Sequence, residues 1–191
     1  FDANGSIDPL LTWYENGVRY PVALRDHMIK QIPSLKKKFV HYGSYAKASI
    51  EDLYPMETLK KGIILEANEL RTCYFENTGG KFKARALPNE AQIAPVKTML
   101  VQDFNGDGSL DLLLAGNDYG PAVEINRYDA SNGVLLLGDG KGAFRFEPNR
   151  FSGFWAMREA RNMALLQMAG GKQAVVVANN NSGLQIFEKR K

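Results

Sequence analysis

The chain is poor in histidine and cysteine, two residues that enzymes often use as bases and nucleophiles: its 191 residues include one cysteine and two histidines. A single cysteine, Cys73, cannot form an internal disulfide bond, and its strand-like surroundings favour a small buried apolar side chain. His27 and His41 lie in or beside a segment with helical spacing, where surface positions are commoner than ligand positions. No Gly-x-Ser-x-Gly motif is present. The sequence therefore favours a protein that is not an enzyme.

Long apolar runs and strong net charge are also missing. No stretch is long and apolar enough to span a membrane as a helix. The formal net charge is only +3, with one basic run at Lys36-Lys37-Lys38. No RNA-recognition signature or helix-turn-helix accompanies that run. We therefore expect a solvated helix end rather than a nucleic-acid site, while contact with an anionic glycan or phospholipid surface stays open.

What the chain has is glycine and apolar residues, with 18 glycines and a hydrophobic fraction of 45%. This composition is typical of a turn-rich β protein that is large enough to bury a core. The segment from Asp103 to Asp111 stands out within it. Gly106 and Gly108 allow the positive φ angles that a tight loop needs. Carboxylate, amide and backbone oxygens at alternate positions suit Ca²⁺, which takes six to eight oxygen ligands. The expected calcium ligands are Asp103, Asn105, Asp107, the carbonyl of Ser109, and Asp111.

The residues after this loop distinguish between calcium motifs. An EF-hand has a bidentate Glu at its twelfth position, followed by a helix, and here that position is Leu114. The apolar run 112–115 ends at Gly116-Asn117 and predicts a buried strand, as does the segment Val96–Gln102 before the loop. The sequence therefore predicts a calcium loop between two strands. A shared ion explains the three carboxylates better than acid–base catalysis does.

The start of the chain carries a second copy of this pattern, because residues 1–11 align with residues 104–114. In this register the chain begins one residue inside the motif, and we expect it to be a fragment. A weaker second calcium site is expected at Asp2, Asn4, Ser6 and Asp8, with a plain Asn-Gly turn as the alternative. A third copy at 164–180 keeps the strand-turn-strand pattern without carboxylates, which predicts a hairpin without metal.

Several further hairpins are predicted at glycine turns. They lie at residues 12–20, 74–82 and 135–144,. The run Gly138-Asp139-Gly140-Lys141-Gly142 lacks the spacing and following helix of a phosphate-binding loop. Residues 21–69 differ: helical spacing predicts helices over 24–39, interrupted at Pro33, over 45–53 with Ser44 as N-cap, and over 56–61, followed by a strand at 63–67.

The loop 103–111 followed by Leu-Leu-Leu-Ala-Gly-Asn resembles the FG-GAP (VCBS, integrin-α-like) repeat, whose calcium loops follow the pattern D-x-[ND]-x-D-G-x-x-D. The chain is similar to the C-terminal part of large bacterial FG-GAP proteins related to the ASPIC/UnbV group. This resemblance implies a mostly β fold of about three β-propeller-like blades. Residues 1–191 would form one propeller fragment with a helical insertion at 21–69, and remaining blades or another copy would cover its open edges.

The same resemblance implies a non-catalytic, calcium-stabilised module that binds a protein or a glycan. Its location would be extracellular, at the cell surface or periplasmic, where millimolar calcium fills loops of modest affinity. An accessory domain of a carbohydrate-active enzyme, with the catalytic part elsewhere, is the alternative, and a purely structural domain is the third. Asp107→Ala or Asp111→Ala should then lower stability only when calcium is present.

Aromatic residues in the connections between strands are the candidate contact surface. They occur at Phe151, Phe154 and Trp155, and in the stretches 119–121 and 127–129. Loop aromatics can contact sugars or proteins. Packing between blades or under the helical segment is the commoner role, and we expect it for most of them.

Overall fold

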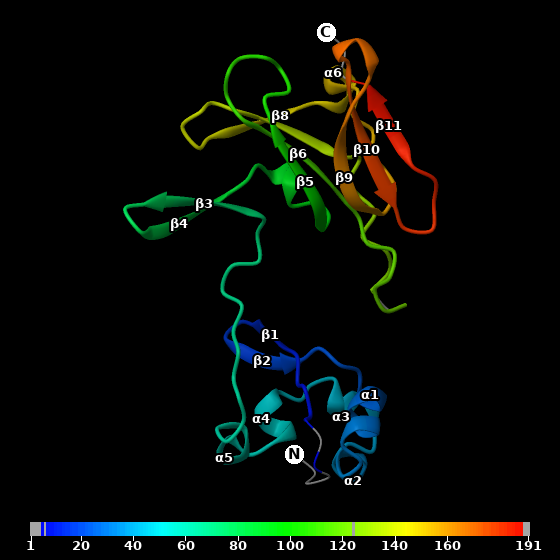
Figure 1. Cartoon of the computed structure of the whole chain (residues 1–191). Helices are drawn as coiled ribbons and strands as arrows, with labels where there is room; N and C mark the ends of the chain where they lie inside the picture. The colour runs from blue at the N-terminus through cyan, green and yellow to red at the C-terminus, as the bar shows by residue number, and fades with distance from the viewer. Residues whose placement is uncertain (1–4, 6, 124, 189–191) are drawn as a thin grey trace. The chain divides into compact units, whose positions relative to one another are not determined.

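The computed structural model describes residues 5, 7–123 and 125–188 (Figure 1). The chain divides into two compact units, residues 1–68 and residues 69–191. Strand accounts for 35% and helix for 18%, so the chain is mostly β, as predicted. The unit boundary lies beside the predicted end of the helical segment at residue 69. That residues 1–191 form one propeller fragment stays a prediction.

The first unit opens with a hairpin and continues with short helices. The hairpin pairs β1 (Thr12–Glu15) with β2 (Val18–Pro21), as predicted. Asn16 and Gly17 at its turn have φ angles of 51° and 80°, which the favoured two-residue hairpin turn requires,. The helices are α1 (Arg25–Gln31), α2 (Leu35–Lys38), α3 (Tyr42–Tyr45), α4 (Ile50–Leu53) and α5 (Met56–Leu59).

Apolar side chains from α1, α2, α4 and α5 fill the centre of the first unit, and the partly buried Tyr45 of α3 packs against them. Pro33 separates α1 from α2, as predicted, so the two helices turn their apolar faces onto one cluster. The Arg19 guanidinium also pairs with the Glu51 carboxylate at 2.8 Å, which joins β2 to α4. The buried members of the cluster are Met28, Ile32, Leu35, Phe39, Ala48, Ile50, Leu53, Tyr54 and Leu59.

Two predictions for this unit are wrong. The helix expected over 45–53 is two helices, and Ser49 rather than Ser44 caps the second. Ser49 Oγ accepts the Asp52 N–H while the Asp52 carboxylate accepts the Ser49 N–H, a reciprocal cap that fixes the start of α4,. Residues 63–67 form no strand in the described part of the chain, and Ile63 and Leu65 are largely exposed.

The described residues of the second unit form three antiparallel sheets, which follow one another in chain order. The first is a hairpin, the second has four strands, and the third has three, with each strand hydrogen-bonded to its neighbour in sequence. A short helix, α6 (Asn149–Ser152), connects the second sheet to the third. The strands are β3 (Cys73–Thr78) and β4 (Lys81–Ala86); β5 (Val96–Gln102), β6 (Asp111–Gly116), β7 (Val134–Gly138) and β8 (Phe144–Glu147); and β9 (Ala160–Gln167), β10 (Gln173–Asn179) and β11 (Gln185–Glu188).

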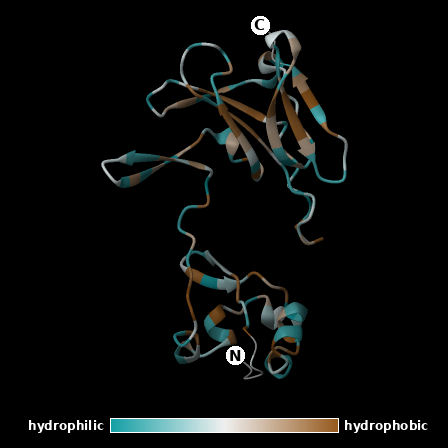
Figure 2. Ribbon diagram, in the orientation of Figure 1, coloured by the Kyte–Doolittle hydropathy of each residue, from teal (hydrophilic) through white to brown (hydrophobic). Residues whose placement is uncertain are grey.

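Strand β6 lies at the centre of this unit and is buried along its whole length. Its side chains point alternately to the two faces of the sheet. Leu113 and Ala115 pack against β9 and β10, while Leu112 and Leu114 pack on the opposite face with Leu87 and residues near β3. Figure 2 shows the hydrophobic colouring concentrated on these central strands. Strands β6 and β7 are therefore covered on both faces of the sheet, whereas Met99 and Val101 of β5 are 52% and 49% exposed.

The strands around the loop agree with the sequence predictions. The predicted strand 96–102 coincides with β5, and the hairpins predicted at 74–82, 135–144 and 164–180 are all present. Cys73 is half-buried rather than buried. The four sheets of the described residues are small and antiparallel, and they do not close into a barrel. Among the described residues, none of the helices has the length and apolar character to cross a membrane.

Candidate metal centre

The candidate loop connects β5 to β6 at one end of the four-stranded sheet. Its glycines adopt the conformations that the sequence predicts, with φ angles of +83° at Gly106 and +87° at Gly108. A side chain at either position would be strained, because residues with a Cβ rarely adopt this region. These two turns fold the backbone back toward its own start, at Asp103.

The Asp103 carboxylate organises the first half of the loop. One of its oxygens accepts the Gly106 N–H at 2.6 Å, and the other accepts the Gly108 N–H at 2.9 Å. Both donors belong to the loop, so the loop wraps around a single carboxylate.

The Asp107 carboxylate organises the second half. It accepts the Asn105 side-chain amide at 2.7 Å and the Ser109 N–H at 2.8 Å. These hydrogen bonds, the one from Asn105 first, hold the pKa of Asp107 below its usual range,. The group is therefore ionised at neutral pH, as a calcium ligand must be.

The Asp111 side chain is fully buried and also holds two segments of backbone together. One oxygen accepts the Phe104 N–H at 2.8 Å, and the other accepts the Gly138 N–H at 2.9 Å. Asp111 thus links the start of the loop to the end of β7. A Cβ built on Gly138 would lie 2.1 Å from the Leu110 carbonyl oxygen, so only glycine lets the two segments approach this closely,.

The side chains of the predicted calcium ligands lie in the same loop, but their oxygens do not face a common centre. Asn105 and Asp107 are in contact, and Asp103 is enclosed by the loop backbone. Among the described residues, no three acidic, histidine or cysteine side chains form a cluster that could hold a metal ion. The donor chemistry fits calcium, and ligation would require these side chains to turn toward a common centre. The second expected site lies mostly outside the described residues, since only Asp8 of its four positions is described.

The sequence does not predict the hydrogen-bond partners of two residues in this region. The Gly138 N–H is a partner of Asp111 across 27 positions of sequence, and only the glycine turn that follows β7 hints at it. Asn117 is the other, a fully buried residue at the end of β6. Its amide nitrogen donates to the Ser131 and Met157 carbonyls, and its oxygen accepts the Ser131 N–H. The Gly-Asn pair signals a turn but not this anchoring role.

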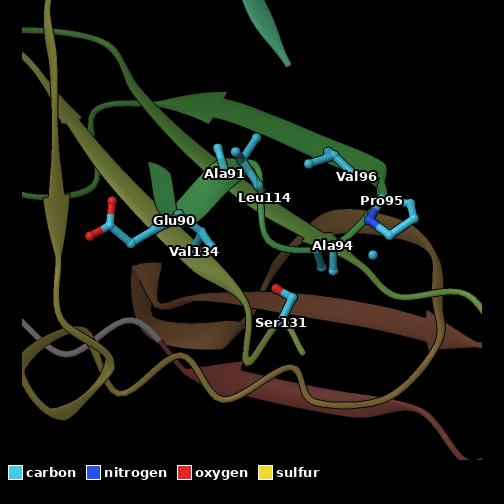
Figure 3. A pocket seen from close by; sticks show the side chains of 10 residues that line it. Glu90, Ala91, Ala94, Pro95, Val96, Leu114, Ser131 and Val134 are labelled. Carbon is cyan, nitrogen blue, oxygen red and sulfur yellow. The ribbon is translucent and has the colours of Figure 1, made fainter. Parts of the chain in front are cut away.

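The histidines and the pocket in Figure 3 offer little for catalysis or ligand binding. His27 and His41 are both exposed. The pocket is lined by residues such as Ala91, Leu114 and Ser131, and holds about 10 Å³. Pockets for small molecules are usually of the order of 300–1,000 Å³, so this one is a packing defect near the β6 terminus with room for about one water molecule.

Comparison with known proteins found no match to this chain among family models, curated proteins or solved structures. The resemblance to FG-GAP repeats therefore stays a prediction that rests on the residues of the loop and its flanking strands.

Proposed function

We propose that the chain is a non-catalytic module whose loop 103–111 binds Ca²⁺ and is stabilised by it. The observation that carries the proposal is a glycine loop that keeps Asp107 ionised, encloses Asp103 and is seated by a buried Asp111. Asp103, Asn105, Asp107 and Asp111 would supply side-chain oxygens, and Ser109 its carbonyl. Binding of the ion then contributes directly to folding free energy.

The four-stranded sheet supports the propeller part of this proposal. Its strands follow one another in an up-and-down order, which is the order in a propeller blade,. Its central strands β6 and β7 are also covered on both faces by neighbouring segments of the same unit. We propose that β5–β8 is one blade, with β3–β4 belonging to the blade before it and β9–β11 to the blade after it.

A binding role for the module follows from this arrangement. A rigid sheet with a fixed loop at one end leaves the connections at the other end to contact a partner, either a protein or a glycan. The proposed location is extracellular, at the cell surface or periplasmic, where calcium is abundant enough for such a loop. An accessory domain of a carbohydrate-active enzyme is the second candidate, favoured by the exposed Trp155 and Tyr128 rings, since aromatic rings can stack on sugars,.

Calcium titration of the chelator-treated chain tests the metal role. We expect about one equivalent of Ca²⁺ to bind with modest affinity and to raise the melting temperature. Asp107→Asn should abolish both effects with little change in the calcium-free melting temperature, because Asp107 is exposed. The matched control is Asp139→Asn, an exposed carboxylate in the β7–β8 turn that also accepts loop N–H groups. Loss of binding in the control alone would contradict the proposal.

A further inference from the structure

The sheet β9–β11 is apolar over most of both its faces. Neighbouring positions along a strand point to opposite faces, and one face lies in the core through residues such as Met163 and Val177. We call the opposite side the outer face of β9–β11; it carries Ala164, Leu166, Ala174, Val176 and Ile186, with Asn162 and Glu188 at its margins. Leu166 is 46% and Ile186 is 62% exposed. An antiparallel sheet with one face in water usually carries polar residues there, so this composition indicates a face that a partner covers.

The hairpin β3–β4 at the start of the unit also has an open apolar face. Tyr74 packs edge-on against Phe144 of β8, with the ring centres 5.8 Å apart, so the side of the hairpin that carries Tyr74 meets the four-stranded sheet. The alternate positions point the other way. Phe75 is 57% and Phe82 is 71% exposed there. We call this side the outer face of β3–β4; it carries Cys73, Phe75, Asn77, Phe82, Ala84 and Ala86.

The three sheets of the unit are layered in chain order, with β5–β8 between the other two (Figure 1). The β6 face with Leu113 and Ala115 packs toward β9–β11, and the face with Leu112 and Leu114 packs with Tyr74 of β3. Among the described residues, the outer face of β3–β4 has no preceding sheet and the outer face of β9–β11 has no following sheet. The two outer faces are therefore the two halves of a sheet-on-sheet contact of the kind that the unit already makes twice.

The charges of these two sheets favour contact between unlike outer faces. The strands β3 and β4 carry three basic residues and one acidic residue, which are Lys81, Lys83, Arg85 and Glu76. Bringing the hairpins of two copies together would place like charges near one another, which is unfavourable. The strands β9, β10 and β11 carry one residue of each sign, Arg161 and Glu188. A hairpin that packs on β9–β11 of a second copy therefore buries its apolar side chains without this repulsion.

We propose that a second copy of this chain covers both outer faces. The outer face of β9–β11 in one copy packs on the outer face of β3–β4 in the other, and the reciprocal contact forms at the same time. Two copies then enclose six sheets, a number within the usual range of about four to eight blades in a closed propeller. Head-to-tail contacts of this kind give closed assemblies when the rotation between copies closes. This inference rests on the proposed function, in that it uses the proposed blade arrangement, and it involves no ligand of the calcium loop.

Sedimentation equilibrium of the full chain tests the association. We expect a mass of about twice the 21.3 kDa of the chain, and a melting temperature that rises with protein concentration,. Ile186→Glu and Phe82→Glu should each raise the dissociation constant of the pair about tenfold or more, because each places a charge in an apolar contact. Phe151→Glu is the matched control, since Phe151 is 67% exposed but lies in α6, outside both outer faces. It should leave the dissociation constant unchanged.

Mixing the two variants tests the head-to-tail arrangement. Each variant keeps the outer face that the other has lost, so an equimolar mixture of Ile186→Glu and Phe82→Glu should form a mixed pair at concentrations where either variant alone is monomeric. A contact between like faces would not behave in this way, because one of the two variants would then associate by itself. Melting curves should show that every variant is folded.

The pairing is overturned if the parent chain stays monomeric at its highest soluble concentration, since the outer faces would then have another partner or none. It is also overturned if either variant associates as well as the parent chain, or if the mixture of the two stays monomeric. A parent chain that is monomeric but binds calcium would refute only this pairing. A chain that forms the pair but shows no calcium response would refute only the metal role.

Discussion

Two connections of the second unit both reverse the chain between neighbouring antiparallel strands, but they do so with different residues. The loop 103–110 joins β5 to β6, and the turn 168–172 joins β9 to β10 at the same end, where the Gln102 side chain donates to that of Gln173 at 2.9 Å. The β9–β10 turn closes through a Met168 N–H to Lys172 carbonyl hydrogen bond and a Gly-Gly pair with positive φ angles. It needs no carboxylate to do so.

The comparison shows that reversing the chain between these strands does not require acidic residues. In the loop 103–110, by contrast, backbone N–H groups donate to the half-buried Asp103, to the exposed Asp107 and to the buried Asp111 at the start of β6. Carboxylates close together repel one another unless a cation lies between them. We infer that the acidic composition of the longer loop serves ion binding, and that Asp111 also serves the fold itself.

The largest effect is expected for Asp111→Ala. It leaves the part-buried Phe104 and Gly138 N–H groups without their acceptor, at up to about 1–3 kcal/mol for each,. Chemical denaturation should show this loss both with calcium and with EDTA. The sequence alone predicts a loss only with calcium, and the two backbone hydrogen bonds are the reason for the revision. Unchanged stability in EDTA would show that Asp111 has no such structural role.

Gly138→Ala should come next, with a loss of about 1–3 kcal/mol from overpacking. The added Cβ would meet the Leu110 carbonyl at 2.1 Å and push β7 away from the loop. Gly170→Ala in the β9–β10 turn is the matched comparison, because its Cβ would meet nothing within 4 Å. It carries only the cost of a positive φ, about 1 kcal/mol. Equal losses in the two variants, measured by urea denaturation, would remove the distinction between the two connections.

Some strands and helices could be predicted from the sequence accurately, and others could not. The alternation at 96–102 and the apolar run after Asp111 specified β5 and β6, because β5 covers every second side chain and β6 is buried along its whole length. The helix boundaries near residue 45 were missed, since Ser44 and Ser49 are both suitable caps and only packing selects between them. Ile63–Ala67 has strand-like composition, but a strand also needs a partner, which composition does not reveal.

In the candidate metal site, too, the sequence does not reveal which distant residues are in contact. Residue types and spacing identified the loop and its glycines. Asp111 accepts the Gly138 N–H from 27 positions away, and the partners of Asn117 at Ser131 and Met157 lie 14 and 40 positions away. These roles therefore follow from the fold and not from the motif. Long-range hydrogen bonds to the backbone leave no periodic signal in a sequence.

Asp107→Ala should have an effect that depends on calcium. In EDTA we expect a small loss, because Asp107 is exposed and its hydrogen bonds are local. At a calcium concentration of about 100 times the dissociation constant, the parent chain should gain about 2.7 kcal/mol that the variant lacks. Thermal melts of both chains, with and without calcium, measure this difference. A gain that is the same in the variant would place the ion elsewhere.

The smallest effect concerns pH. The pKa of Asp107 is lowered, first by the Asn105 amide and then by the Ser109 N–H. A lowered pKa means that the contribution of Asp107 to stability is fully present above the pKa of the unfolded chain, about 3.9. It is lost as the pH falls through the lower pKa of the folded chain. NMR titration of the calcium-free chain should place the Asp107 pKa below 3.8, its ordinary value, and a higher value would contradict the hydrogen-bond geometry.

The most direct test of the account is calorimetric titration of Ca²⁺ into the chelator-treated chain, paired with melting curves in calcium and in EDTA. The account predicts about one equivalent bound to the loop 103–111, a rise in melting temperature, and loss of both in Asp107→Ala. A second, weaker event would point to the loop at Asp2–Asp8. No heat and no shift in melting temperature would contradict the central claim, and the acidic loop would then be a hairpin connection like that between β9 and β10.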